Sequence, residues 1–241
     1  MSIESYATRI RQGFGDHAAA RLELKPFMPL AHYFEIFDFQ PYAYWPEPEY
    51  SSETWAIHYG LFQIFKHDFG FLLPSRELMD RLAGILRQEI GADGRVLDAG
   101  SGSGFISNEL CRRGIDAFAV DRCDYENRAR EFGYPIIAVY QRDALGDAVD
   151  HVSSQFAAVL LIWPPYEQPF AFDIAKAMQP GQLLIFEGEG ADGCTGDDKF
   201  FEYVADGNCW TALKGLSDQL DAVHVTFATQ SDHWMIWRKA R

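Results

Sequence analysis

The sequence contains few cysteines, few basic residues and no long apolar segment. Its four cysteines lack the close pairing of zinc sites and small disulfide scaffolds, so we expect reduced thiols and a cytoplasmic location. The 21 lysines and arginines are outnumbered by 35 aspartates and glutamates, and this acidic balance disfavours nucleic acid as a partner. No apolar run approaches the length of a membrane span, and the N-terminus lacks the basic and apolar regions of a signal peptide. These absences favour a protein that acts on a small molecule or another protein, away from membranes.

The chain is long and apolar enough for one α/β domain with an extension. It has 241 residues, of which 48% are hydrophobic. Residues 1–75 hold 17 of the 36 aromatic side chains, and we expect residues 1–74 to form an aromatic-rich helical cap. The cap either packs against one side of the main domain or closes as a lid over a substrate pocket, and its composition suits both uses.

The segment at residues 95–110, RVLDAGSGSGFISNEL, has the pattern of a strand, a glycine turn and a helix. Val96 and Leu97 predict a buried strand that Asp98 ends, and the helix is predicted to begin at Phe105. Three alternating glycines lie between the two elements: Gly100, Gly102 and Gly104. They permit a turn with positive φ, a close approach of the backbone to a ligand and tight packing of helix on strand. A dinucleotide-binding turn reads G-x-G-x-x-G, whereas here the third glycine comes one residue early and Phe105 replaces the last glycine.

This D-x-G-x-G-x-G run resembles motif I of the class I S-adenosylmethionine-dependent methyltransferases. The resemblance implies an α/β fold with a Rossmann-like sheet that is mostly parallel and seven-stranded, with an antiparallel closing hairpin. It also implies S-adenosylmethionine as the cofactor, with its methionine part held by the glycine turn and by Asp98, directly or through water. The segments FGFLLPS, LLIWPPY and GEGADGCTGDD are similar to a poorly characterised branch of these proteins.

Two further acidic residues follow predicted strands. Asp121 ends a strand predicted over residues 115–121, and a carboxylate there can accept hydrogen bonds from both ribose hydroxyls. Asp143 follows a third strand predicted over residues 135–140, and the resemblance assigns it to the adenine amino group. The two carboxylates are therefore the expected ribose and adenine ligands.

The apolar segment at residues 156–163 predicts a central strand that is buried on both faces. Trp163, Pro164, Pro165 and Tyr166 stand at its end, and WPPY resembles the [DNS]PP[YF] motif of amino-group methyltransferases. In that family the first side chain and the adjacent carbonyl accept hydrogen bonds from the target amino group, and the last aromatic ring stacks on a planar substrate. Trp163 departs from this pattern because an indole can only donate. We expect Trp163, Pro164 and Tyr166 to shape an acceptor site for a planar ring or a cation; the alternative is that the two prolines only end the strand.

A fifth strand, predicted over residues 182–186, leads into the acidic and glycine-rich run EGEGADGCTGDD. Within this run, Thr195 and Asp198 predict a capping box at the start of a helix. Besides solvation, Glu187 and Glu189 have three alternative uses: to bind a cationic substrate, to act as a general base or to ligate a divalent metal. No set of partner ligands accompanies them, so we expect no metal site and take Glu187 as the first candidate for a base.

Two predicted elements frame the domain. Ser75 is expected to cap a helix with an apolar stripe made of Leu78, Met79, Leu82, Ile85, Leu86 and Ile90. At the other end, residues 220–229 and 233–239 predict the two strands of the closing antiparallel hairpin. Such a hairpin is typical of the methyltransferase sheet and foreign to the dehydrogenase sheet.

These patterns predict a cap over residues 1–74 and a methyltransferase-like domain over residues 75–241. The expected reaction transfers a methyl group from S-adenosylmethionine to a small molecule or a protein side chain. One alternative is a non-catalytic interaction module that keeps the same fold. Another is an NAD(P)-dependent oxidoreductase, against which the missing last glycine and the closing hairpin both argue.

Overall fold

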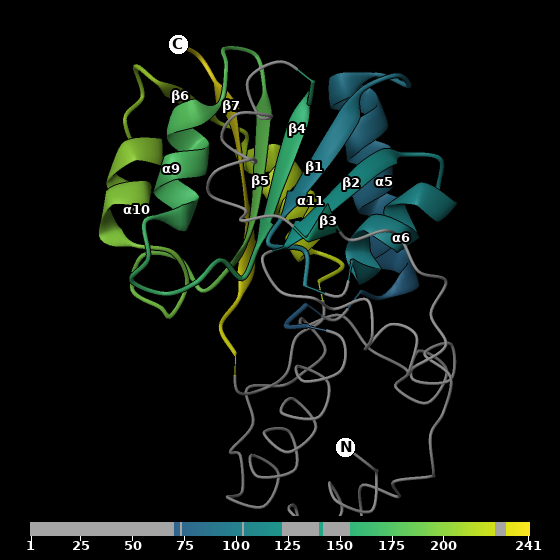
Figure 1. Ribbon diagram of the computed structural model, residues 1–241, viewed down its shortest axis with the longest axis horizontal. Coiled ribbons are helices and arrows are strands. Elements are labelled where there is room, and N and C mark those ends of the chain that lie inside the picture. Colours follow the sequence, from purple (N-terminus) through teal and green to yellow (C-terminus); the bar gives the residue numbers. More distant parts are fainter. Residues whose placement is uncertain (1–69, 73, 103, 122–139, 142–154, 225–229) are drawn as a thin grey trace, which may run out of the picture.

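The computed structural model describes residues 70–241 except residues 73, 103, 122–139, 142–154 and 225–229. The described residues form an α/β unit in which helices cover both faces of one sheet (Figure 1). Residues 1–69 of the predicted cap lie outside the described residues, as do Asp143 and most of the third predicted strand.

Within the described part of the chain, seven strands form the sheet in the order β3-β2-β1-β4-β5-β7-β6. They are β1 (Arg95–Ala99), β2 (Asp116–Asp121), β3 (Tyr140–Gln141), β4 (Ala158–Ile162), β5 (Leu183–Gly188), β6 (Trp210–Ala212) and β7 (His233–Lys239). The strands from β3 to β5 pair in parallel, whereas β7 runs antiparallel to both β5 and β6. The α/β class and the mixed sheet with an antiparallel end are therefore confirmed, with the six longer strands as its body and the two-residue β3 at one edge.

The closing end of the sheet differs from the predicted hairpin. The partner of β7 is β6, and residues 220 and 221 belong to helix α11 (Lys214–Asp221) rather than to a strand. Leu213, Leu216 and Leu220 recur at helical spacing and pack into the core, which favours a helix over the predicted strand. The hairpin prediction over residues 220–229 is thus wrong where the structure tests it, and residues 225–229 lie outside the described part.

The core lies on both faces of the sheet. Helices α5 (Arg76–Ile90), α6 (Phe105–Arg112) and α11 cover one face, and α9 (Phe170–Ala177) and α10 (Asp198–Val204) cover the other (Figure 1). In β4, alternate residues enter the two core clusters: Ala158 and Leu160 on one face, Val159 and Leu161 on the other. This arrangement confirms the prediction of a central strand that is buried on both faces.

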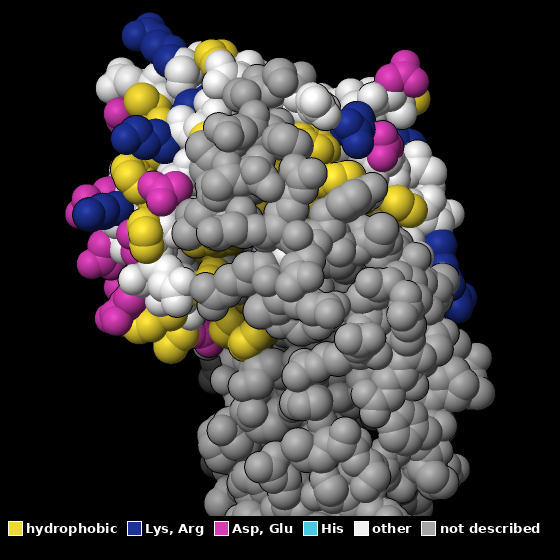
Figure 2. All heavy atoms as spheres, in the orientation of Figure 1, with side chains coloured by type: hydrophobic (Ala, Val, Ile, Leu, Met, Phe, Trp, Pro, Cys, Tyr) yellow, Lys and Arg dark blue, Asp and Glu magenta, His cyan; other side chains and the backbone are white. Residues whose placement is uncertain are grey.

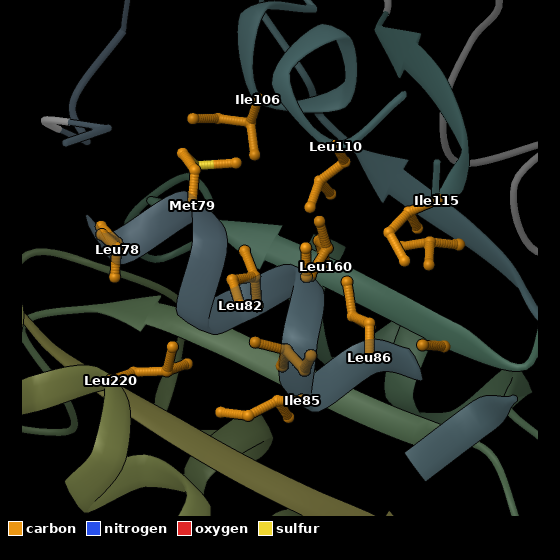
Figure 3. Close-up of a cluster of buried hydrophobic side chains, with 14 of the residues drawn as sticks. Leu78, Met79, Leu82, Ile85, Leu86, Ile106, Leu110, Ile115, Leu160 and Leu220 are labelled. Atoms are coloured by element: carbon orange, nitrogen blue, oxygen red, sulfur yellow. The ribbon is translucent and has the colours of Figure 1, made fainter. Parts of the chain in front are cut away.

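Helix α5 supplies the largest apolar contribution to the first face. Figure 3 shows its side chains directed toward α6, β4 and α11, with these residues labelled: Leu78, Met79, Leu82, Ile85, Leu86, Ile106, Leu110, Ile115, Leu160 and Leu220. The five labelled α5 side chains are at most 3% exposed. The apolar stripe read from the sequence is therefore the buried face of this helix.

Helix α5 is capped as predicted. The Ser75 hydroxyl accepts a hydrogen bond from the backbone N–H of Leu78 at 3.1 Å. We expect Ser75→Ala to lower the free energy of unfolding by about 1 kcal/mol, because a backbone donor of the first turn loses its acceptor. Denaturant unfolding measures the effect, and Gln88→Ala is the control, because Gln88 is exposed and its amide makes an exposed hydrogen bond to the neighbouring Glu89 carboxylate. Equal stability of the two variants would contradict a stabilising cap.

Helix α10 begins differently from the prediction. Asp197 is the N-cap, and its carboxylate accepts from the backbone N–H of Phe200 at 3.1 Å. The Thr195 hydroxyl instead accepts from the backbone N–H of Glu189 at 3.0 Å. The capping box of Thr195 and Asp198 is therefore wrong: Gly196, with φ 68°, turns the chain between Thr195 and the helix.

The described surface carries charges of both signs. Figure 2 shows Lys and Arg side chains interspersed with Asp and Glu side chains over α9 and α10, on the left of the view. Cys111, Cys194 and Cys209 are free thiols. Among the described residues, no helix combines the length and apolarity that a bilayer crossing requires.

Candidate active site at the carboxyl ends of the strands

The glycine turn joins β1 to α6 and folds over the end of β2. The backbone N–H groups of Gly100 and Ser101 both donate to the carbonyl of Val120, at 2.9 and 3.0 Å. Gly100, Gly102 and Gly104 have φ of 75°, 57° and 73°, a region that side-chain-bearing residues rarely occupy. The structure therefore places the three predicted glycines in one left-handed turn beside the first two strands.

Asp98 is buried under this turn. It is 2% exposed, and its carboxylate accepts a hydrogen bond from the Ser107 hydroxyl of α6 at 2.7 Å. Burial raises the pKa of the Asp98 carboxyl to about 6; the Ser107 bond opposes the rise, and the nearby charge of Asp121 adds to it. The raised pKa marks a carboxylate whose negative charge is incompletely compensated, so a cation bound beside it would be stabilised.

Asp121 ends β2 next to the same turn. Its side chain is only 9% exposed, and one carboxylate oxygen accepts from the backbone N–H of Gly102 at 2.9 Å. The register aligns Asp98 with Ala119, so Asp121 stands at the carboxyl end of the sheet, where ligands of open α/β sheets bind. The structure thus brings Asp98, Asp121 and the three glycines together, whereas Asp143 lies outside the described residues.

Trp163 begins the loop after β4. Its φ is 48°, a strained value for a residue with a side chain, and its backbone N–H donates to the Glu187 carbonyl at 2.8 Å. Its indole stacks on the Phe71 ring with the two centroids 4.7 Å apart and the planes at 16°. Phe71 belongs to the predicted cap, so the C-terminal end of that segment contacts the proposed acceptor loop.

Pro164 and Tyr166 occupy different environments. Pro164 is buried, and its carbonyl accepts from the backbone N–H of Gly196 at 3.2 Å, which ties the WPPY loop to the glycine-rich loop after β5. Tyr166 is 52% exposed. Trp163 and Pro164 therefore each contact a neighbouring segment of the chain, whereas the Tyr166 side chain is exposed to solvent.

Glu187 stands near the end of β5 and is completely buried. His224 and Asp232, 3% and 8% exposed, lie beside it, and ligand atoms of the three side chains are all within 4.8 Å of one another. Burial and the nearby charge of Asp232 raise the pKa of the Glu187 carboxyl well above its ordinary range. The neighbouring Glu189 carboxylate has a different role, because it accepts from the backbone N–H of Cys194 at 3.0 Å and holds its own loop.

His224 and Asp232 are the residues that sequence reasoning missed. His224 follows α11 and Asp232 precedes β7, so both are far from Glu187 along the chain. The antiparallel register of β5 and β7, which aligns Gly188 with His233, brings them to Glu187. Locally the sequence carries no signal of this pairing beyond the position of Asp232 next to a predicted strand.

Comparisons with known proteins found similarity to solved structures only. No family model matches the chain, and no curated protein matches it. An S-adenosylmethionine-dependent methyltransferase from Clostridium acetobutylicum is 12% identical, with a TM-score of 0.45, over 76% of this chain and 99% of its own. An rRNA methylase from Streptococcus thermophilus is 16% identical, with a TM-score of 0.43, over 68% and 94%. A precorrin-6y C5,15-methyltransferase from Geobacter metallireducens is 14% identical, with a TM-score of 0.44, over 70% and 91%.

Proposed function

We propose that the protein transfers a methyl group from S-adenosylmethionine to a small molecule or a protein side chain. The observation that carries the proposal is the left-handed glycine turn between β1 and α6, with Asp98 and Asp121 at the ends of the two strands beneath it. The antiparallel β7 at the end of a parallel sheet supports it, because the resemblance of motif I implies this sheet and a dehydrogenase lacks it.

The residues present fit the cofactor. The incompletely compensated Asp98 carboxylate suits the ammonium group of the methionine part, and Gly100, Gly102 and Gly104 would seat that part against the backbone. Asp121, already oriented by the Gly102 N–H, would accept from the ribose hydroxyls. Asp143 is the proposed adenine ligand.

The acceptor is proposed to bind beside Trp163, Pro164 and Tyr166. When bound, S-adenosylmethionine supplies an electrophilic methyl group on a positively charged sulfur. The acceptor atom would contribute the electron pair of the new bond to the methyl carbon as the carbon–sulfur bond breaks, and S-adenosylhomocysteine would be the leaving group. Trp163 and Pro164 would align the acceptor and exclude water, the source of most rate enhancement in such a single displacement.

Gly102 offers a test of cofactor binding with a matched control. A Cβ added at Gly102 or at Gly114 meets no atom of the described residues within 4 Å, and both residues have positive φ. Both alanine variants should therefore carry a similar strain of about 1–2 kcal/mol. Only Gly102→Ala should weaken S-adenosylhomocysteine binding, by about tenfold, because only its methyl group intrudes on the proposed cofactor. Equal affinity of the two variants, measured by calorimetry, would remove the cofactor from this turn.

Methyl transfer itself is tested with S-adenosylmethionine that carries a labelled methyl group. Planar aromatic amines, phenols and cationic amines are the small acceptors, and a denatured protein mixture supplies side chains. We expect S-adenosylhomocysteine to form only with an acceptor present, and formation to fall in Gly102→Ala but not in Gly114→Ala. Cofactor binding without turnover on any acceptor class would favour the non-catalytic interaction module.

A further inference from the structure

Glu187, His224 and Asp232 form a buried cluster that the cofactor site does not use. Glu187 lies on β5 in register with Trp234 of the neighbouring strand β7 (Figure 1). His224 Nε2 lies 3.3 Å from an Asp232 carboxylate oxygen and 3.8 Å from a Glu187 carboxylate oxygen. These three residue types are common metal ligands, so the protonation state of the side chains decides whether the cluster can bind a metal ion.

A tryptophan fixes the protonation of His224. The indole N–H of Trp234 lies 2.9 Å from His224 Nδ1, and an indole nitrogen can only donate. Nδ1 must therefore accept, which makes His224 neutral with its hydrogen on Nε2. That nitrogen faces Asp232 as a donor, and a metal ion there would require an imidazole that has lost both of its hydrogens.

Two carboxyl groups that lie together in a buried site favour the binding of one proton between them. Trp163 Nε1 is buried and faces the Glu187 carboxyl without closing a hydrogen bond of standard geometry to it. His224 and Trp163 supply one N–H each. With both carboxyls ionised, two negative charges would stand together in a buried site, which is strongly unfavourable.

We infer that Glu187 is a neutral carboxylic acid that donates its proton to the Asp232 carboxylate, and that this acid pair positions Trp163. The hydrogen bonds then run from the Trp163 indole to Glu187, from Glu187 and His224 to Asp232, and from Trp234 to His224. Every donor in this network has an acceptor, as buried polar groups require. The assignment of Trp163 to an acceptor wall rests on the proposed function, whereas the proton on Glu187 does not.

The acid pair explains how Trp163 is held in a strained conformation. Its φ of 48° is maintained by its backbone bond to the Glu187 carbonyl, by the Phe71 ring and by the Glu187 carboxyl. Loss of the Glu187 proton at alkaline pH would set a second negative charge against Asp232. Among the described residues, Asp221 on α11 adds a further repulsive charge, and the neutral His224 adds no compensating one. Trp163 should then lose its fixed orientation.

Infrared and nitrogen-15 NMR spectra test the proton directly. We expect the wild-type protein at neutral pH to show the carbonyl band of a buried protonated carboxylic acid, absent in Glu187→Gln and retained in Glu189→Gln. The Glu187→Gln amide can donate and accept as the acid does, so the Trp163 indole N–H resonance, assigned with Trp163→Phe, should keep its position and slow exchange. In the wild type this resonance should change at alkaline pH, whereas in Glu187→Gln it should not.

Three results would overturn the inference. The first is a wild-type spectrum without a Glu187-dependent acid band, and the second is a His224 ring with its hydrogen on Nδ1. The third is stoichiometric binding of Zn²⁺ or Mn²⁺ to chelator-treated protein that disappears in Glu187→Gln, which would make the cluster a metal site. Neither readout depends on S-adenosylmethionine, so failure here is distinguishable from failure of the proposed function.

Discussion

Replacement of Asp121 by alanine is expected to weaken binding of S-adenosylmethionine and S-adenosylhomocysteine about 100-fold, the equivalent of about 2.7 kcal/mol. Two ribose hydroxyls would lose a charged acceptor, and a hydrogen bond to a charged group contributes about 1.5–3 kcal/mol. The Gly102 N–H would also lose its 2.9 Å bond, so the turn above the strand becomes less ordered. Calorimetric titration of the purified variant measures the loss.

The control for this variant lies at the other end of the same strand. Asp116 pairs with Arg95 at 2.9 Å and has a side chain that is 60% exposed, so Asp116→Ala should leave the affinity unchanged. Asp121→Asn separates the two roles of the carboxylate, because its amide oxygen can still accept from Gly102 while the negative charge is gone. An Asp121→Ala protein that folds and binds with unchanged affinity would remove the ribose assignment.

The affinity for S-adenosylhomocysteine is expected to fall about tenfold between pH 7 and pH 5, because binding of the ammonium group requires an ionised Asp98. The pKa of this carboxyl is raised to about 6 by burial, so the free protein is increasingly protonated there below pH 6. Bound cofactor favours the charged form, and protonation competes with binding. Affinity should therefore be nearly constant above pH 7 and decline progressively below it.

Asp98→Asn is the matched variant for this pH dependence. Its amide oxygen can still accept from the Ser107 hydroxyl, so the turn keeps its support, but no charge titrates. Affinity at pH 7 should drop about tenfold or more, and its dependence on pH should disappear. A variant that retains the wild-type pH profile would assign the titration to another group.

Asp98 should affect folding in the opposite direction. Its pKa is raised from 3.8 in the unfolded chain to about 6 in the folded one, so the native state binds the proton more tightly. The stability contributed by this group is therefore complete below about pH 4 and is lost as the pH rises to 6. In the absence of cofactor, protonation of Asp98 at acidic pH therefore stabilises the folded state. The same protonation weakens cofactor binding.

Local patterns were sufficient to predict the elements on either side of the glycine turn. The strand, turn and helix of residues 95–112 each carry their own signal: a buried apolar pair, glycines that need positive φ and an amphipathic helix. The Ser75 cap and the apolar stripe of α5 could likewise be predicted from the sequence, because capping and helical periodicity involve neighbours only a few residues apart. The same is true of the doubly buried strand β4.

Features that depend on distant contacts could not be predicted. The β5–β7 register decides that Asp232 and His224 meet Glu187, and no local pattern encodes that register. The left-handed φ of Trp163 is equally non-local, since Glu187 on β5 and the Phe71 ring hold it. At the closing end of the sheet, residues 220 and 221 were predicted to begin a strand, but they end helix α11, which packs on β7 and α5.

The central claim is that the glycine turn binds S-adenosylmethionine, and parallel calorimetric titrations with S-adenosylmethionine, S-adenosylhomocysteine and NADH test it most directly. The account predicts micromolar binding of the first two ligands at one site per chain, and no heat from NADH. Binding of NADH alone would contradict it and favour an oxidoreductase. Binding of none of the three would also contradict it, and would leave the turn as part of a non-catalytic interaction module.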